Sequence, residues 1–114
     1  HLEPGGVFCT YAEETRERFV QNDTYTSTHR SGEVEVALVE NFYDADPGDS
    51  LFEMTFVFLI RQQGRLRIEV DQHDAGLFPV ETWRRLLAES GFQVYEHIFA
   101  DGDCPFFTGV KPLR

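Results

Sequence analysis

Apolar and polar residues alternate most regularly in the middle of the chain. From Glu33 to Val39, acidic and apolar side chains alternate before the sequence becomes fully apolar. Over Leu51–Arg61, bulky apolar side chains recur at every second position, namely Phe52, Met54, Phe56 and Phe58. The segment Arg65–Gln72 repeats this pattern with Leu66, Ile68 and Val70. Because successive side chains of a strand point to opposite faces, these segments predict a three-stranded antiparallel meander with one buried face.

Turn-forming residues separate these strands from one another. Asp44–Ser50 contains Pro47-Gly48 and three aspartates, and Gln62–Gly64 is a short hairpin turn. Nearer the N-terminus, Gly5-Gly6 precedes a predicted strand over Val7–Tyr11. The polar segment that follows is read as a short helix or a solvated connection over Glu13–Gln21. Asp23–Arg30 is then an exposed strand or an irregular loop.

The period of the pattern changes after the meander. Apolar residues between Phe78 and Phe92 recur at spacings of three and four, which predicts an amphipathic helix; they are Val80, Trp83, Leu86 and Leu87. Pro79 suits the first turn of this helix, and Gly91 suits a left-handed cap at its end. Two more strands are expected, Gln93–Phe99 and Cys104–Val110, joined by a polar turn over Ala100–Asp103.

Size and charge limit the classes of function. A chain of 114 residues with 41% hydrophobic residues is long enough for one domain with a core. The formal net charge of −10 argues against nucleic acid and anionic membranes as partners, since phosphate contacts need clustered Lys and Arg. Cys9 and Cys104 lack the spacing of a metal site, so no metal is expected, and both are interpreted as reduced core thiols of a cytoplasmic protein.

Several short motifs occur in a recognisable order. His1-Leu2-Glu3-Pro4-Gly5-Gly6 precedes the first strand, Leu77-Phe78 precedes the helix, Ser90-Gly91-Phe92 ends it, and Phe106–Val110 is the last strand. In this order, the motifs resemble the C-terminal half of a class I S-adenosylmethionine-dependent methyltransferase. The resemblance implies an α+β fold with the fifth strand, the late helix and the last two strands of a truncated Rossmann-like domain.

The meander would be an insertion into this fold. Such an insertion, with Asp71-Gln72-His73 at its end, is similar to the amino-sugar N,N-dimethyltransferases of deoxysugar biosynthesis. The chain is then a single domain over 1–114 and a fragment of a larger enzyme. Residues 1–22 form the fifth strand and its connection, 23–76 the antiparallel insertion, and 77–114 the late helix and the last two strands.

Two segments depart from the amino-sugar enzymes. After the fifth strand those enzymes carry an acid, a proline and two tryptophans, where this chain has Tyr11-Ala12-Glu13-Glu14. Near the C-terminus they carry a Ser-Gly-Arg-Gly turn, where this chain has Gly102-Asp103-Cys104-Pro105. Both segments lie near the substrate in that family, so a nucleotide-linked amino sugar is not implied and the substrate stays open.

The resemblance also implies S-adenosylmethionine as the cofactor of the parent enzyme. The glycine-rich cofactor loop and the acidic residue for the ribose precede the Pro-Gly-Gly turn in these enzymes, and this chain has no equivalent of them. We therefore expect the fragment to bind no cofactor and to be inactive alone, and we expect a preceding segment that carries the loop.

Four residues are candidates for contact with a small-molecule substrate. His73, between Asp71 and Asp74, is the catalytic candidate, since a histidine beside an acid can orient an amine or take its proton near neutral pH. Asp71 is its partner, and Tyr11 and Glu13 emerge at the end of the first strand. The alternatives are a histidine bonded to loop backbone and a solvated helix start.

Two classes of function remain open. The first is the substrate-binding and lid portion of a methyltransferase that acts on a small molecule, with an amine preferred as acceptor. The alternative is a stand-alone α+β module that binds a small ligand or dimerises, without catalysis. Self-association is expected in either case, because the predicted strand Val7–Tyr11 has an apolar edge on which a second copy can pair.

Overall fold

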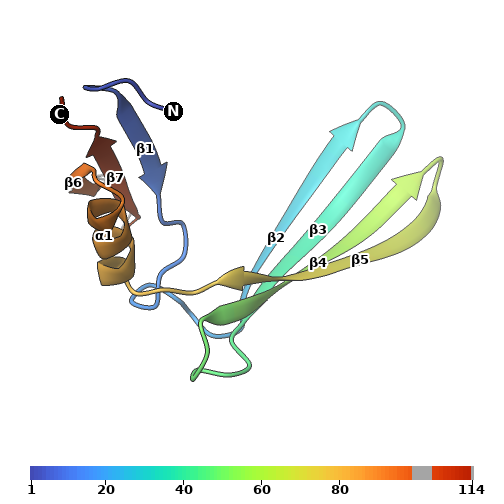
Figure 1. Cartoon of the computed structure of the whole chain (residues 1–114). Coiled ribbons are helices and arrows are strands. Elements are labelled where there is room, and N and C mark those ends of the chain that lie inside the picture. The colour runs from blue at the N-terminus through green and yellow to red at the C-terminus, as the bar shows by residue number, and fades with distance from the viewer. Residues whose placement is uncertain (99–103, 114) are drawn as a thin grey trace. The chain divides into compact units, whose positions relative to one another are not determined.

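The chain forms two compact units, each with its own sheet (Figure 1). The computed structural model describes residues 1–98 and 104–113. The first unit consists of residues 1–19 and 77–114, and the second of the continuous segment 20–76. Each unit is described by itself, and the prediction that 1–114 is a single domain stays a prediction.

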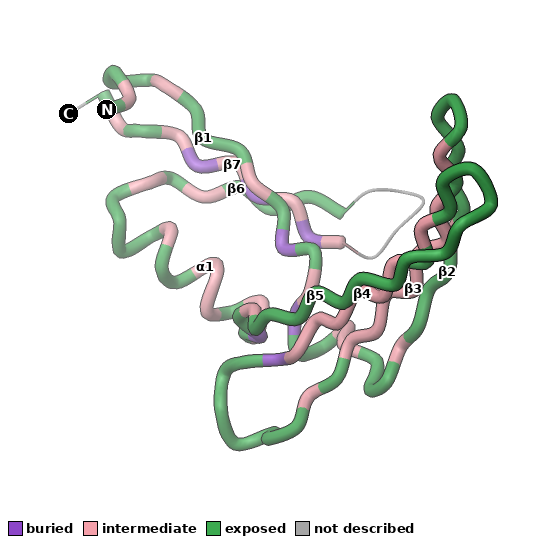
Figure 2. Tube along the Cα trace, turned by 90° about the vertical axis from the view of Figure 1, so that its right-hand side faces the viewer, coloured by how far each residue is buried: buried purple, intermediate pink, exposed green. Residues whose placement is uncertain are grey.

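The first unit contains a three-stranded antiparallel sheet. Its strands are β1 (Val7–Tyr11), β6 (Gln93–Ile98) and β7 (Pro105–Val110), in the order β1-β7-β6. The central strand β7 is the most buried, and Phe107 on it is fully inaccessible (Figure 2). These strands confirm three predicted segments, while Phe99 and the expected turn Ala100–Asp103 lie outside the described residues. Cys9 is exposed, which corrects its interpretation as a core thiol.

Helix α1 (Val80–Glu89) packs against β6 and β7. The rings of Trp83 and Phe107 stack with centroids 6.3 Å apart. The helix lies within the predicted range, Pro79 immediately precedes it, and Gly91 adopts the left-handed conformation with φ of 93°. Its N-terminus is also held, because the backbone N–H of Val80 donates to the Glu17 carboxylate at 3.1 and 3.2 Å.

The segment after β1 is a turn-rich connection and not a helix. The backbone N–H groups of Arg18 and Phe19 both donate to the carbonyl of Thr15, at 3.1 and 2.9 Å. The N–H of Arg16 donates to the carbonyl of Phe78 at 3.1 Å. The point where the chain leaves the first unit is thereby tied to the point where it returns.

The second unit is a four-stranded antiparallel meander in the order β2-β3-β4-β5. The strands are β2 (Asp23–Ser31), β3 (Val34–Tyr43), β4 (Leu51–Gln62) and β5 (Arg65–Gly76). The predicted antiparallel meander is confirmed, and the segment Asp23–Arg30, for which a strand and a loop were both open, is a fourth strand of it. The Ser/Thr-rich segment pairs with β3 along its whole length, because Thr is well suited to an extended backbone despite its polarity.

The register of the β4–β5 hairpin corrects the prediction of one buried face. Gln63 and Gly64 have φ of 53° and 78°, as a tight two-residue turn requires, and this pairs Gln62 with Arg65. Residues that are partners across strands share a face, so Phe56 lies beside Asp71, and Leu59 beside Ile68. The apolar residues of β5 thus lie on the face opposite to the row of Phe side chains.

Both faces of this sheet carry apolar side chains. The face that we call the aromatic face includes Tyr25, Leu38, Glu40, Phe42, Phe52, Met54, Phe56, Phe58, Asp71 and His73. The opposite face, which we call the valine face, includes Thr26, Thr28, Ala37, Val39, Val57, Leu59, Leu66, Ile68 and Val70. Strand β5 is exposed along nearly its whole length (Figure 2).

Candidate functional site

His73 lies on the aromatic face of the second unit, near the end of β5. Its partner on β4 is Met54, and its ring centroid lies 5.5 Å from that of Phe56. The pleat of β5 brings Asp71 to the same face, two residues earlier. The structure therefore brings together two of the predicted site residues, Asp71 and His73, and adds an aromatic contact.

The side chains of His73 and Asp71 lie close to each other, and both are accessible to solvent. His73 Nδ1 lies 3.7 Å from Asp71 Oδ1, which is longer than a hydrogen bond and makes an ion pair when the imidazole is protonated. The side chains are 48% and 62% exposed. Such an exposed pair adds little to stability. The imidazole nitrogens can therefore meet a ligand, with a carboxylate close enough to stabilise the imidazolium.

The floor beside His73 is made of aromatic rings. Tyr25 and Phe42 have centroids 6.0 Å apart, and Phe42 and Phe52 have centroids 6.1 Å apart. Phe52 is buried, while Phe42 and Phe56 are half-buried. An aromatic floor of this kind can pack against the apolar face of a ring-shaped ligand.

Glu40 is a further candidate for the site that the sequence analysis missed. It is the partner of both Tyr25 and Phe56 in the sheet, so its carboxylate belongs to the same face as Asp71 and His73. The signal was present in the sequence, because Glu40 interrupts the alternate apolar positions Val36, Leu38 and Phe42. Two carboxylates and one imidazole on an aromatic floor suit a ligand that combines a cationic amine with a ring.

Tyr11 and Glu13, the other predicted site residues, belong to the first unit. Tyr11 is the last residue of β1 and is 56% exposed. Its partner is Phe106, so it lies on the face of the sheet opposite to Phe107 and α1. Glu13 is exposed, and its carbonyl accepts a hydrogen bond of 2.8 Å from Arg18 Nη1. Their role as substrate contacts stays a prediction.

The start of α1 does not offer an open anion site. The described part of the chain has one helix, and its N-terminus is not open to a ligand, since Pro79 has no N–H and the N–H of Val80 is bonded to Glu17. No group of three His, Cys, Asp or Glu side chains within residues 1–98 and 104–113 could hold a metal ion. Within the same residues, no helix has the length and apolar character needed to cross a membrane.

No family model matches this sequence, and no curated protein matches it significantly. Several solved structures have the same fold. DesVI from Streptomyces venezuelae matches with a TM-score of 0.85 at 23% identity, over 97% of this chain and 46% of its own. S-adenosylmethionine-bound CalS10 from Micromonospora echinaspora, an amino pentose methyltransferase involved in calicheamicin biosynthesis, matches with a TM-score of 0.83 at 19% identity, over 97% and 46%.

A third structure extends this likeness. KedS8 from a Streptoalloteichus species, a sugar N-methyltransferase, matches with a TM-score of 0.82 at 18% identity, over 98% of this chain and 44% of its own. The chain thus spans less than half the length of these three structures. Identities at this level show the fold, and the predicted α+β fold, a part of the class I methyltransferase fold, is confirmed.

Proposed function

We propose that this chain is the acceptor-binding portion of an S-adenosylmethionine-dependent methyltransferase, and that the acceptor is a small-molecule amine. The fold shared with sugar methyltransferases supports the reaction class. The observation that carries the choice of an amine is the placement of Asp71 and His73 on the aromatic face, with the His73 ring 5.5 Å from Phe56. S-adenosylmethionine is the cofactor of the whole enzyme in this proposal, and this chain alone neither binds it nor catalyses.

The chemistry of an amine acceptor matches the three groups. A protonated amine is attracted by the carboxylates of Asp71 and Glu40, and it must lose its proton before its nitrogen can act as a nucleophile. The imidazole of His73 accepts that proton, and Asp71 at 3.7 Å stabilises the imidazolium that forms. The ring of Phe56 packs against the apolar part of the acceptor and orients it.

The alternative is a stand-alone module that binds a small ligand or dimerises, without catalysis. The observation that favours it is the exposed apolar surface of the second unit, where Ile68 and Val70 are 58% and 64% exposed. Its ligand site would be the same aromatic face. The two functions differ in whether a methyl donor is needed, so they are separated by measuring binding and transfer in one sample.

The experiment is an NMR titration of the chain with D-glucosamine, with D-glucose as the matched probe that lacks the amine. We expect glucosamine to shift the resonances of Phe56, Asp71 and His73 with a dissociation constant of roughly millimolar size, or about −4 kcal/mol. Glucose should bind at least about threefold more weakly, since it loses the charge-assisted contact. S-adenosylmethionine alone should shift nothing.

The variant His73→Gln is compared with His97→Gln, which changes an exposed histidine of the first unit. Only the former should weaken glucosamine binding. Equal binding of glucosamine and glucose, or shifts confined to the first unit, would contradict an amine site on the aromatic face. Methyl transfer from S-adenosylmethionine by this chain alone would contradict its assignment as an acceptor-binding portion.

A further inference from the structure

Carboxylates surround His73 on the aromatic face of the second unit. Asp71 lies two residues before His73 on β5, and Glu69 lies two residues before Asp71, with about 7 Å between their Cα atoms. Glu40 lies on the other side of Phe56 from Asp71, two strands or about 10 Å away. A molecule bound at His73 therefore meets negative charge both along β5 and across the sheet.

Asp23 continues this negative surface to the outer strand β2. It belongs to one row of strand partners with Phe42, Met54 and His73. Its Oδ2 accepts a hydrogen bond of 2.7 Å from the hydroxyl of Tyr25, which fixes the carboxylate beside the aromatic rings. Acidic side chains on β2, β3 and β5 thus share the face on which the rings lie.

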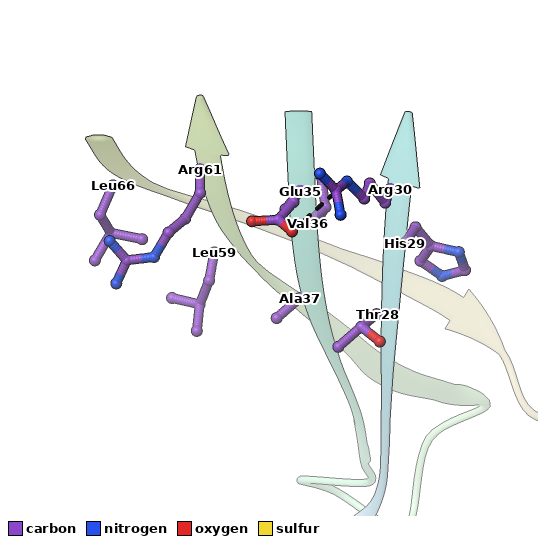
Figure 3. Close-up of a pocket in the computed structure, with 9 residues that line it drawn as sticks. All are labelled: Thr28, His29, Arg30, Glu35, Val36, Ala37, Leu59, Arg61 and Leu66. Carbon is purple, nitrogen blue, oxygen red and sulfur yellow. Dashed lines mark ion pairs between the residues drawn. The ribbon is translucent and has the colours of Figure 1, made fainter. Parts of the chain in front are cut away.

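The positive charges of the second unit lie at the other end of its strands. Its arginines are all near the two hairpin turns, namely Arg30, Arg61, Arg65 and Arg67. Arg30 and Arg61 belong to the valine face, where they line a pocket of about 410 Å³ (Figure 3). Arg67 belongs to the aromatic face, but its Cα is about 20 Å from that of His73 along β5. Its Nε also lies 3.1 Å from Glu69 Oε1, so its charge is already paired.

We propose that the acceptor bound at this site carries its amine on an uncharged skeleton, without a phosphate group near the amine; this rests on the proposed function of the site and names the class of its acceptor. In a sugar that carries both groups, the phosphate lies about one ring away from the amine. Glu69 and Glu40 lie at a similar distance from Asp71. Like charges repel at such a distance, and more strongly where aromatic rings displace water.

This specificity gives the methylation a place in a sequence of reactions. Activated sugars are commonly joined to a nucleotide through a diphosphate, and transfer of the sugar to a neutral molecule releases that diphosphate. For an amino-sugar acceptor, a group transfer or a dephosphorylation must therefore supply the substrate before the methyl group is added. Glu69 and Glu40 determine this order, because their charges lie next to the amine site.

The test is an NMR titration of the full chain with D-glucosamine and with D-glucosamine 6-phosphate. We expect the phosphate to bind at least about fivefold more weakly at Phe56, Asp71 and His73. The 6-O-methyl ether of glucosamine is the matched probe for size, because it enlarges the same position without adding charge. It should bind as glucosamine does.

Salt separates repulsion from other causes of weak binding. The Debye length falls from about 10 Å at about 0.1 M salt to about 3 Å at about 1 M. The dissociation constants of glucosamine and its phosphate should therefore approach each other when sodium chloride is raised over this range. A difference that salt does not change would overturn an electrostatic origin of the specificity.

Two variants with the same change of charge test the part of the aromatic face. Glu69→Gln acts on this face, while Glu53→Gln acts on the valine face. The former also frees Arg67, so the preference for glucosamine over its phosphate should fall at least about threefold. Glu53→Gln should leave this preference unchanged. The side chain of Glu69 is 57% exposed, so its replacement should keep the fold, which circular dichroism checks.

The remaining outcomes overturn the specificity in distinguishable ways. Equal or tighter binding of the phosphate at the same residues contradicts it and leaves the amine site in place. Binding of neither sugar contradicts the proposed function and the specificity together. If the methyl ether binds as weakly as the phosphate, size excludes the phosphate. If Glu69→Gln and Glu53→Gln act equally, the net charge of the chain is the cause and the aromatic face is not.

Discussion

The guanidinium of Arg84 clamps the carboxylate of Glu96, with Nε and Nη2 donating to its two oxygens at 2.6 and 2.9 Å. Arg84 lies on α1 and Glu96 on β6, so this bidentate pair ties the helix to the sheet of the first unit. Bidentate geometry makes such a pair stronger than a single contact between exposed charges.

The first prediction concerns the pH dependence of this unit. The hydrogen bonds from Arg84 lower the pKa of Glu96 below its ordinary value of 4.5, against the opposing effect of burial. A carboxyl group whose pKa is lower in the folded state stabilises the fold above its unfolded pKa, and this contribution is lost as the pH falls through the folded pKa. In urea unfolding, the free energy of unfolding should therefore decrease as the pH falls below about 4.5. The variant Glu96→Gln should show a smaller decrease.

Glu89→Gln is the control for that measurement, because it removes an exposed ion pair with Arg85 within α1. It should leave the acid dependence nearly as it is. If Glu96→Gln and Glu89→Gln reduced the loss of stability at low pH equally, the pair of Arg84 and Glu96 would not be its specific cause.

The second prediction concerns the stacked pair of Trp83 and Phe107. The indole Nε1 of Trp83 is buried and has no hydrogen-bond partner among the described residues. Trp83→Phe removes this unsatisfied group and keeps the ring contact, so the free energy of unfolding should change by less than about 1 kcal/mol. Phe107→Ala leaves a cavity at a fully buried position and should cost about 3–5 kcal/mol. Equal losses in urea unfolding would contradict this reading.

The third prediction concerns the β4–β5 turn. Gln63 is one of the non-glycine residues with positive φ, and Gly64 follows it at 78°. Gln63→Asn creates the Asn-Gly pair that this turn favours and should raise the thermal midpoint, by a gain of roughly 0.5 kcal/mol. Gly64→Ala should act in the opposite direction, by about 1 kcal/mol, although no atom lies within 4 Å of the added methyl. The same sign for both changes would be inconsistent with a positive-φ turn.

The fourth prediction concerns Glu40 on the aromatic face. Replacing this half-buried acid by Leu should raise the free energy of unfolding by about 1 kcal/mol, because an acid among aromatic rings is poorly solvated. The same change should weaken glucosamine binding in the NMR titration. Glu40→Gln, which removes the charge and keeps the shape, should weaken binding with a smaller effect on stability. Unchanged binding in both variants would remove Glu40 from the site.

The elements that could be predicted are those in which periodicity and turn chemistry agree. The helix and the strands over Val7–Tyr11 and Leu51–Arg61 have both signals, and the structure places them within a few residues of the predicted bounds. The strand β2 lacks the periodicity, because its Thr and Ser side chains do not show which residues face a core. A polar strand becomes evident only through its pairing with β3.

The candidate site depends on register, which a single strand does not reveal. Asp71 and His73 were predicted as a pair from their motif. The contact between His73 and Phe56 could not be predicted in this way, because it follows from the register that the two-residue turn at Gln63 and Gly64 imposes on β4 and β5. A turn one residue longer would move every side chain of β5 to the other face. The same shift decides whether Ile68 and Val70 lie on the aromatic face or on the valine face.

The hydrogen bond between Arg16 and Phe78 has a consequence for the modular nature of this chain. Since these two residues are in contact within the first unit, the whole segment 20–76 departs from and returns to one closed stem. The entropy of closing a loop grows only with the logarithm of its length, so such a stem tolerates cassettes of very different size. We expect that a short glycine-serine linker can replace the segment without unfolding the first unit, and that the stem can carry a foreign domain in its place.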